Sequence, residues 1–145
     1  MDCKAAFPVD YNHLMLSTPA APASILIVDD EEAVSQTFAR LLRLEGYAVR
    51  TAMDAASGLV EARAHHPDAI VLDLRMPAVD GLAFLRQLRA NEADRHVPVA
   101  VVTGDYFLDP HVSAELRQLG AQVTFKPLWF EELVRLARTL TKVTS

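Results

Sequence analysis

Cysteine is almost absent from this chain of 145 residues, since Cys3 is the only one. A single thiol forms neither an internal disulfide nor a cysteine-based metal site, so we expect a cytoplasmic location rather than a secreted, disulfide-stabilised scaffold. Long hydrophobic runs are also missing: no apolar stretch reaches the ~18 residues of a membrane span, and the N-terminus lacks the apolar core of a signal peptide. Membrane insertion is therefore not expected.

Positive charge is in short supply as well. The chain has 14 Lys and Arg against 19 Asp and Glu, a net charge of -5. With no basic surplus to neutralise a phosphate backbone, direct nucleic-acid binding is not expected. What the chain does have is apolar content, 51% of its residues, which is enough for one well-buried core.

Three segments are expected along the chain. Residues 1–23 are interpreted as a flexible Pro/Ala-rich leader, because proline and small residues offer little to a core. Docking of the leader on the domain or on a partner remains an alternative, since it contains five larger apolar side chains, Phe7, Tyr11, Leu14, Met15 and Leu16. Residues 24–141 form the predicted domain, and residues 142–145 form a C-terminal tail.

From residue 24 onward, short apolar runs alternate with longer segments of helical period, a pattern typical of repeated βα units. Five runs predict strands, at residues 25–28, 47–52, 69–72, 97–102 and 123–125. Three of them are apolar almost throughout, as in parallel strands that are covered on both faces. The sequence therefore predicts an α/β fold with a doubly wound, five-stranded parallel sheet.

The segments between and after these runs have the leucine spacing of amphipathic helices. Gly46 and Gly120 stand where helices are expected to end, while Asp54 and the pair Asp109-Pro110 are typical of helix starts. Five helices are predicted, the last of which begins near Trp129 and Phe130. These two rings are expected to pack against the domain, with an exposed docking face at Trp129 as the alternative.

Polar residues follow four of the five predicted strands. They are Asp29 and Asp30, Asp73, Thr103, and Lys126. Parallel strands end at one edge of the sheet, so these side chains are expected to lie together. Clustered carboxylates suit Mg²⁺, and a hydroxyl with a lysine suits phosphoryl oxygens. Asp73, on the predicted central strand, is best placed to attack a phosphoryl donor and become an acyl phosphate.

Four motifs resemble those of the receiver domains of two-component response regulators, a family with the flavodoxin-like (βα)5 fold. The motifs are residues 27–31 (IVDDE), 73–81 (DLRMPAVDG), 102–104 (VTG) and 125–127 (FKP). The resemblance implies that Asp73 is the phosphoacceptor. It also implies that Mg²⁺ is held by Asp29, Asp30, Asp73 and the backbone carbonyl of Arg75, with Thr103 and Lys126 binding the phosphoryl oxygens.

The same resemblance implies the partners. The phosphoryl group would come from a sensor histidine kinase or a histidine phosphotransfer protein, and the output would pass to a downstream protein target. The domain is then a stand-alone switch and not an enzyme, apart from assisting its own phosphorylation and dephosphorylation. A relay intermediate, a terminal switch and a piece of a longer regulator all remain open.

Two local features bear on how such a switch works. Receivers usually carry Tyr or Phe three residues before the lysine, and here that position is Val123. The loop from Gly104 to Asp109 and the helix that follows it are therefore expected to carry the conformational change. The Lys126-Pro127 bond is expected to be cis, which is typical of the family.

Two other classes of function compete with the switch. A Mg²⁺-dependent phosphatase with an Asp nucleophile uses similar groups, but it usually has a second acid two residues after the nucleophile, where this chain has Arg75. A flavodoxin-like cofactor binder needs a phosphate-cradling loop, but the first strand leads into four consecutive acids, residues 29–32. The switch is the preferred hypothesis.

Overall fold

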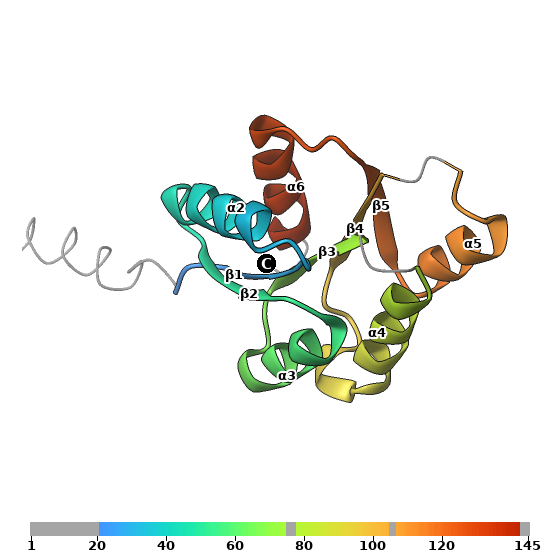
Figure 1. The fold of residues 1–145 in the computed structure, drawn as a ribbon. Helices are drawn as coiled ribbons and strands as arrows, with labels where there is room; N and C mark the ends of the chain where they lie inside the picture. The colour runs from blue at the N-terminus through green and yellow to red at the C-terminus, as the bar shows by residue number, and fades with distance from the viewer. Residues whose placement is uncertain (1–20, 75–77, 105–106, 143–145) are drawn as a thin grey trace, which may run out of the picture.

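Five parallel strands form one sheet in a computed structural model that describes residues 21–74, 78–104 and 107–142 (Figure 1). The strand order is β2-β1-β3-β4-β5. The strands are β1 (Ser24–Val28), β2 (Ala48–Ala52), β3 (Ala69–Leu74), β4 (Val99–Thr103) and β5 (Ala121–Phe125). The helices are α2 (Glu32–Leu44), α3 (Ala55–His65), α4 (Ala78–Ala90), α5 (Pro110–Gln118) and α6 (Phe130–Lys142). The predicted doubly wound α/β fold is confirmed.

The helices cover both faces of the sheet, as Figure 1 shows. Helices α2 and α6 bury their apolar side chains on one face, with Leu42, Leu133 and Leu136 in the core. Helices α3, α4 and α5 cover the other face, where Phe84 and Leu116 are fully buried. Each central strand therefore packs against helices on both sides, which explains why its sequence is apolar at successive positions.

Local signals set several of the element boundaries. Gly46 and Gly120 follow α2 and α5 with φ angles of 100° and 77°, a conformation that glycine adopts without strain. The Asp54 carboxylate accepts a hydrogen bond from the Ser57 backbone N–H at 2.7 Å, so it caps α3. Asp109 accepts one from the His111 N–H at 2.7 Å and caps α5. These predicted starts and ends are confirmed.

Other details differ from the sequence-based expectations. Strand β4 begins at Val99 rather than residue 97, because Pro98 has no N–H to donate to the sheet. Strand β5 begins at Ala121, directly after the Gly120 turn. A short 3-10 helix, Glu92–Asp94, was not predicted. Trp129 and Phe130 do not pack into the core as expected, since their exposed fractions are 64% and 39%; the exposure of Trp129 agrees with the alternative interpretation.

No helix in the described ranges is long and apolar enough to cross a lipid bilayer.

Candidate functional site

Two buried carboxylates lie at the ends of neighbouring strands. Val28 of β1 pairs with Leu72 of β3, so Asp29 and Asp73 both come one residue after a paired position. Asp29 and Asp73 are only 1% and 4% exposed. The parallel pairing, which is set by apolar residues far from each other in the sequence, therefore brings these two acids to one edge of the sheet.

Lys126 supplies the positive charge at this edge. Its Nζ lies 2.6 Å from the Asp73 Oδ1 atom, and the lysine side chain is 24% exposed. The Lys126 backbone N–H donates to the Thr103 carbonyl at 2.8 Å, which ties the end of β5 to the end of β4. The Lys126-Pro127 peptide bond is cis, as the resemblance implied. In the sequence, Lys126 lies 53 residues after Asp73.

The remaining predicted residues differ in exposure. Asp29 is buried and its Oδ1 accepts a hydrogen bond from the Glu31 backbone N–H at 2.9 Å, whereas Asp30 is exposed beside it. Thr103, at the end of β4, is 2% exposed. Arg75, whose carbonyl was expected to bind a metal, lies outside the described residues. The edge thus combines carboxylates, a hydroxyl and one ammonium group.

This set of oxygen donors fits Mg²⁺. Across residues 21–74, 78–104 and 107–142, no group of three or more His, Cys, Asp and Glu side chains is arranged to hold a metal ion. Mg²⁺ does not need such a cage, because it keeps several waters and is usually bound by one or two carboxylates. Asp29 and Asp73 are both buried at this edge, and a divalent cation would offset the repulsion between two such carboxylates.

A cavity of about 410 Å³ opens next to Asp73 and Lys126. Its walls are mainly apolar, and they come from α2, from the end of β4 and from the connection between β5 and α6: Val34, Phe38, Val102, Gly104, Pro127 and Leu128. In the sequence, Val34 and Phe38 stand four residues apart, which is the spacing of the apolar face of a helix. Periodicity does not distinguish a side chain facing the core from one facing a cavity, so this wall was missed.

The structure defines the surroundings of Val123, which stands where receivers usually carry Tyr or Phe. Val123 lies in β5 and packs, partly buried, against the core cluster beneath α3, α4 and α5. The aromatic residue of this strand is Phe125, which pairs in register with Thr103 and is 43% exposed. Tyr106, in the loop expected to carry the change, lies outside the described residues.

Known proteins match most of the chain. The family model of the response regulator receiver domain matches residues 25–138. The transcriptional regulatory protein PrrA of Mycobacterium tuberculosis is 37% identical over 127 residues, which are 88% of this chain and 53% of that protein. The response regulator MprA of Mycolicibacterium vanbaalenii is 37% identical over 124 residues, 86% of this chain and 52% of that protein. The chain thus spans about half the length of the curated relatives it matches.

Solved structures agree with this match. The chemotaxis protein CheY4 of Vibrio cholerae superposes with a TM-score of 0.74 at 28% identity, covering 83% of this chain and 99% of that one. The receiver domain of NtrX from Brucella abortus gives a TM-score of 0.68 at 28% identity, covering 81% of this chain and 98% of that one.

Proposed function

Because this chain belongs to the response regulator receiver domain family, and so to phosphorylation-controlled signalling, we propose that Asp73 is the residue that accepts the phosphoryl group. The observation that carries the proposal is the buried Asp73 carboxylate with Lys126 Nζ 2.6 Å from its Oδ1. A carboxylate in this position is oriented and is in contact with the cation that a phosphoryl group needs. The family match does not support the alternative of an Asp-nucleophile phosphatase.

The proposed step is an in-line transfer from a phosphohistidine of a sensor kinase or phosphotransfer protein. A carboxylate oxygen of Asp73 forms a bond to phosphorus while the phosphorus–nitrogen bond of the donor breaks, and the electron pair of that bond stays on the imidazole. The product is an aspartyl phosphate. Lys126 then bonds a phosphoryl oxygen in place of Asp73 Oδ1, and the Thr103 hydroxyl donates to another.

We propose that Asp29, Asp30 and Asp73, with the backbone carbonyl of Arg75, hold Mg²⁺ at this edge. When bound, the ion offsets the negative charge that spreads over the equatorial phosphoryl oxygens. The exposed Asp30 can contact the ion through water, while the buried Asp29 keeps its position through the Glu31 N–H. The domain would then assist its own phosphorylation, because this chain supplies the acceptor Asp73, the Lys126 ammonium group, the Thr103 hydroxyl and the carboxylates that would hold the ion.

The apolar cavity beside Asp73 supports a protein donor. A phosphohistidine must bring its imidazole next to the acceptor, and the apolar walls from α2 and from Pro127 and Leu128 lie directly beside Asp73. Such walls exclude water around the transferring group. We propose that the output passes from this edge to a downstream protein partner.

Intact-mass measurement tests the acceptor. The protein is incubated with Mg²⁺ and acetyl phosphate, and the wild type is expected to gain the mass of one phosphoryl group while Asp73→Asn gains none. Asp68→Asn is the matched control, because Asp68 lies just before the same strand and binds the Ser24 N–H at the opposite edge. No adduct in the wild type, or an equal adduct in Asp73→Asn, would overturn the proposal.

A further inference from the structure

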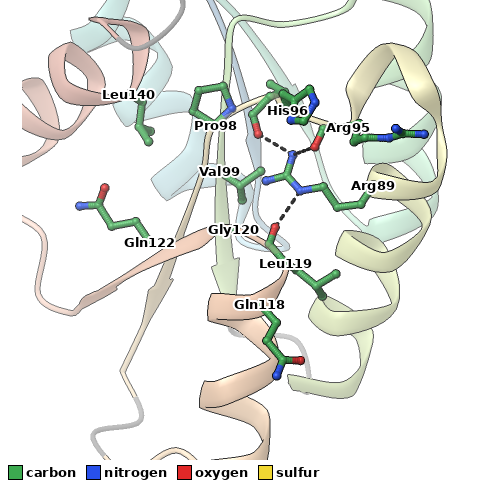
Figure 2. Close-up of a pocket in the computed structure, with 11 residues that line it drawn as sticks. Arg89, Arg95, His96, Pro98, Val99, Gln118, Leu119, Gly120, Gln122 and Leu140 are labelled. Atoms are coloured by element: carbon green, nitrogen blue, oxygen red, sulfur yellow. Dashed lines mark hydrogen bonds between the residues drawn. The ribbon is translucent and has the colours of Figure 1, made fainter.

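A second cavity, of about 540 Å³, lies at the edge of the sheet where β4 and β5 begin (Figure 2). It is bounded by the last turn of α4, the end of α5 and Leu140 of α6. Asp73 and Lys126 lie at the ends of their strands, so this cavity is at the opposite edge from the proposed phosphorylation site. The proposed function therefore leaves it without a role.

Arg89 is oriented at this cavity by backbone carbonyls. Its Nε donates to the Leu119 carbonyl at 2.8 Å, and its Nη1 donates to the carbonyls of Val97 at 2.7 Å and Arg95 at 3.1 Å. These bonds restrict the planar guanidinium to one orientation. Nη2 makes no hydrogen bond to any residue of the described ranges, and Figure 2 shows it on the side of Val99 and Gly120, facing the cavity.

Gly120 lies next to this nitrogen. A Cβ atom added to Gly120 would lie 3.6 Å from Arg89 Nη2, in van der Waals contact, so the glycine borders the nitrogen without a side chain that covers it. Two N–H donors of the guanidinium remain for a ligand, because Nε and Nη1 are already engaged. An oxygen acceptor is the chemical partner that such donors require.

The charge around the cavity favours an anion. None of its described lining residues is acidic, although the chain as a whole has a net charge of -5. Burial lowers the pKa of Arg89, while the nearby charge of Asp94 raises it. The Asp94 carboxylate itself accepts from the Asn91 amide at 2.9 Å and does not line the cavity.

The other lining residues indicate the chemistry of the part of the ligand that does not contact Arg89. Val97, Pro98, Val99 and Leu140 provide apolar wall, and His96 and Gln122 are polar groups at its sides. This mixture of apolar surface with a few polar groups is typical of small-molecule sites. We propose that the cavity binds a small organic acid, with its carboxylate on Arg89 Nη2 and its short carbon chain on the apolar wall. The apolar wall favours an acid that carries a carbon chain over inorganic phosphate, which has no apolar part.

Titration by two-dimensional NMR tests this site with butyrate as the probe, at constant ionic strength maintained with chloride. We expect saturable shifts of the amides of residues 96–99 and 118–122, with a dissociation constant on the order of millimolar for so small a ligand. Inorganic phosphate, titrated in parallel, distinguishes the other anion. Stronger saturable binding of phosphate at the same amides would overturn the choice of a carboxylate, and equal shifts with chloride alone would show that no site exists.

A variant that keeps Arg89 intact completes the test, because replacing Arg89 would leave several carbonyls without their donor. Gln122 is exposed on β5 beside the cavity. Gln122→Glu places a carboxylate there, and the repulsion is expected to weaken butyrate binding about tenfold. Gln87→Glu on the exposed surface of α4 is the matched control and should leave binding unchanged. Equal affinity in all three proteins would overturn the proposal.

Discussion

Asp29 and Asp73 are carboxylates with little exposure to water, in a site where Lys126 is the cation in contact with Asp73. Burial next to a like charge disfavours two ionised carboxylates, and the cost is offset only by a cation or by hydrogen-bond donors. A divalent cation held by these carboxylates would supply such an offset. Binding of Mg²⁺ is expected to stabilise the fold, since a ligand stabilises only the state that binds it.

Asp30→Asn tests this expectation at the residue scale. In the wild type, Mg²⁺ at 100 times its dissociation constant should add about 2.7 kcal/mol to the free energy of unfolding, measured as a rise in melting temperature. In Asp30→Asn the rise should largely vanish. Glu32→Gln, an exposed acid two residues further on, serves as the control. A full Mg²⁺ response in Asp30→Asn would mean that this acid only stabilises the start of α2.

Gly58 shows how closely α3 approaches the sheet. A Cβ at this position would lie 3.0 Å from Val28 Cγ2 and 3.0 Å from Phe84 Cε1. Both neighbours are 0% exposed, so neither has free space to move into. Alanine in place of glycine raises helix propensity by about 1 kcal/mol, whereas overpacking costs about 1–3 kcal/mol.

Gly58→Ala is accordingly expected to lower the free energy of unfolding by about 1 kcal/mol, measured by urea denaturation. The loss should shrink when Phe84→Leu removes the contacting ring atom, so that the two changes are not additive. A more stable Gly58→Ala protein would show that the helix shifts to accommodate the methyl group.

At the element scale, two arginines of α4 hold the C-terminal half of α5. Arg86 forms a bidentate pair with Glu115, with distances of 2.6 and 2.7 Å, and Arg89 Nε bonds the Leu119 carbonyl at 2.8 Å. The N-terminal end of α5 instead follows the loop that leaves Thr103. A change at the acceptor is therefore expected to move the start of α5 more than its end.

Hydrogen exchange with and without beryllofluoride, a phosphoryl mimic, measures this difference. Protection should change most in residues 107–114 and least in residues 115–119. Glu115→Gln should extend the change toward the end of the helix, because it weakens the pair with Arg86. If the main changes occur in α2 and residues 107–119 are unaffected, the output surface has been misplaced.

The same ion pair has a pH dependence. The hydrogen bond from Arg86 lowers the pKa of Glu115 below its ordinary value of 4.5. Because the folded-state pKa is the lower one, the pair stabilises the fold above about pH 4.5, and this contribution is lost as the pH falls through the folded-state pKa.

Melting temperatures of the wild type and Glu115→Gln should therefore differ at pH 7, and the difference should shrink as the pH falls below about 4.5. The difference is expected to be small, since the Arg86 and Glu115 side chains are 52% and 33% exposed and the pair lies at the surface. Glu131→Gln, at the exposed start of α6, is the comparison. A difference that persists unchanged at pH 3 would show that Glu115 contributes through packing instead.

On the scale of the whole molecule, two hydrophobic clusters share one sheet. Ile25 and Ile27 belong to the cluster under α2 and α6, whereas Leu26 and Val28 belong to the cluster under α3, α4 and α5. Because β1 contributes side chains to both clusters, the two faces are expected to unfold together.

Leu42→Ala and Leu85→Ala test this coupling from opposite faces. Both leucines are 0% exposed, and each truncation should cost about 2–5 kcal/mol. Far-ultraviolet and near-ultraviolet circular dichroism should report the same denaturation midpoint in both variants. Separate midpoints for the two signals would show that one face melts before the other.

Much of the fold was predictable from local patterns. The apolar runs of β1 and β3, the glycines after α2 and α5, and the caps Asp54 and Asp109 all act within a few residues of their own position. The 3-10 helix at residues 92–94 was missed, and the exposure of Trp129 was expected only as the alternative to packing. A short turn and the surroundings of one ring depend on neighbours that are distant in sequence, such as Arg89 beside the 92–97 segment.

By itself, the sequence determined the alternation of strands and helices and the identity of the polar residues that end the strands, because hydrophobic period and strand termination are local properties. Only the tertiary structure decided that Lys126 Nζ contacts Asp73 and that Arg89 directs a nitrogen into a cavity. It also decided the register of β4 and β5, in which Thr103 pairs with Phe125 and not with Val123. These features arise from strand register and helix packing. Both depend on side chains that meet across the whole chain, and no local pattern specifies them.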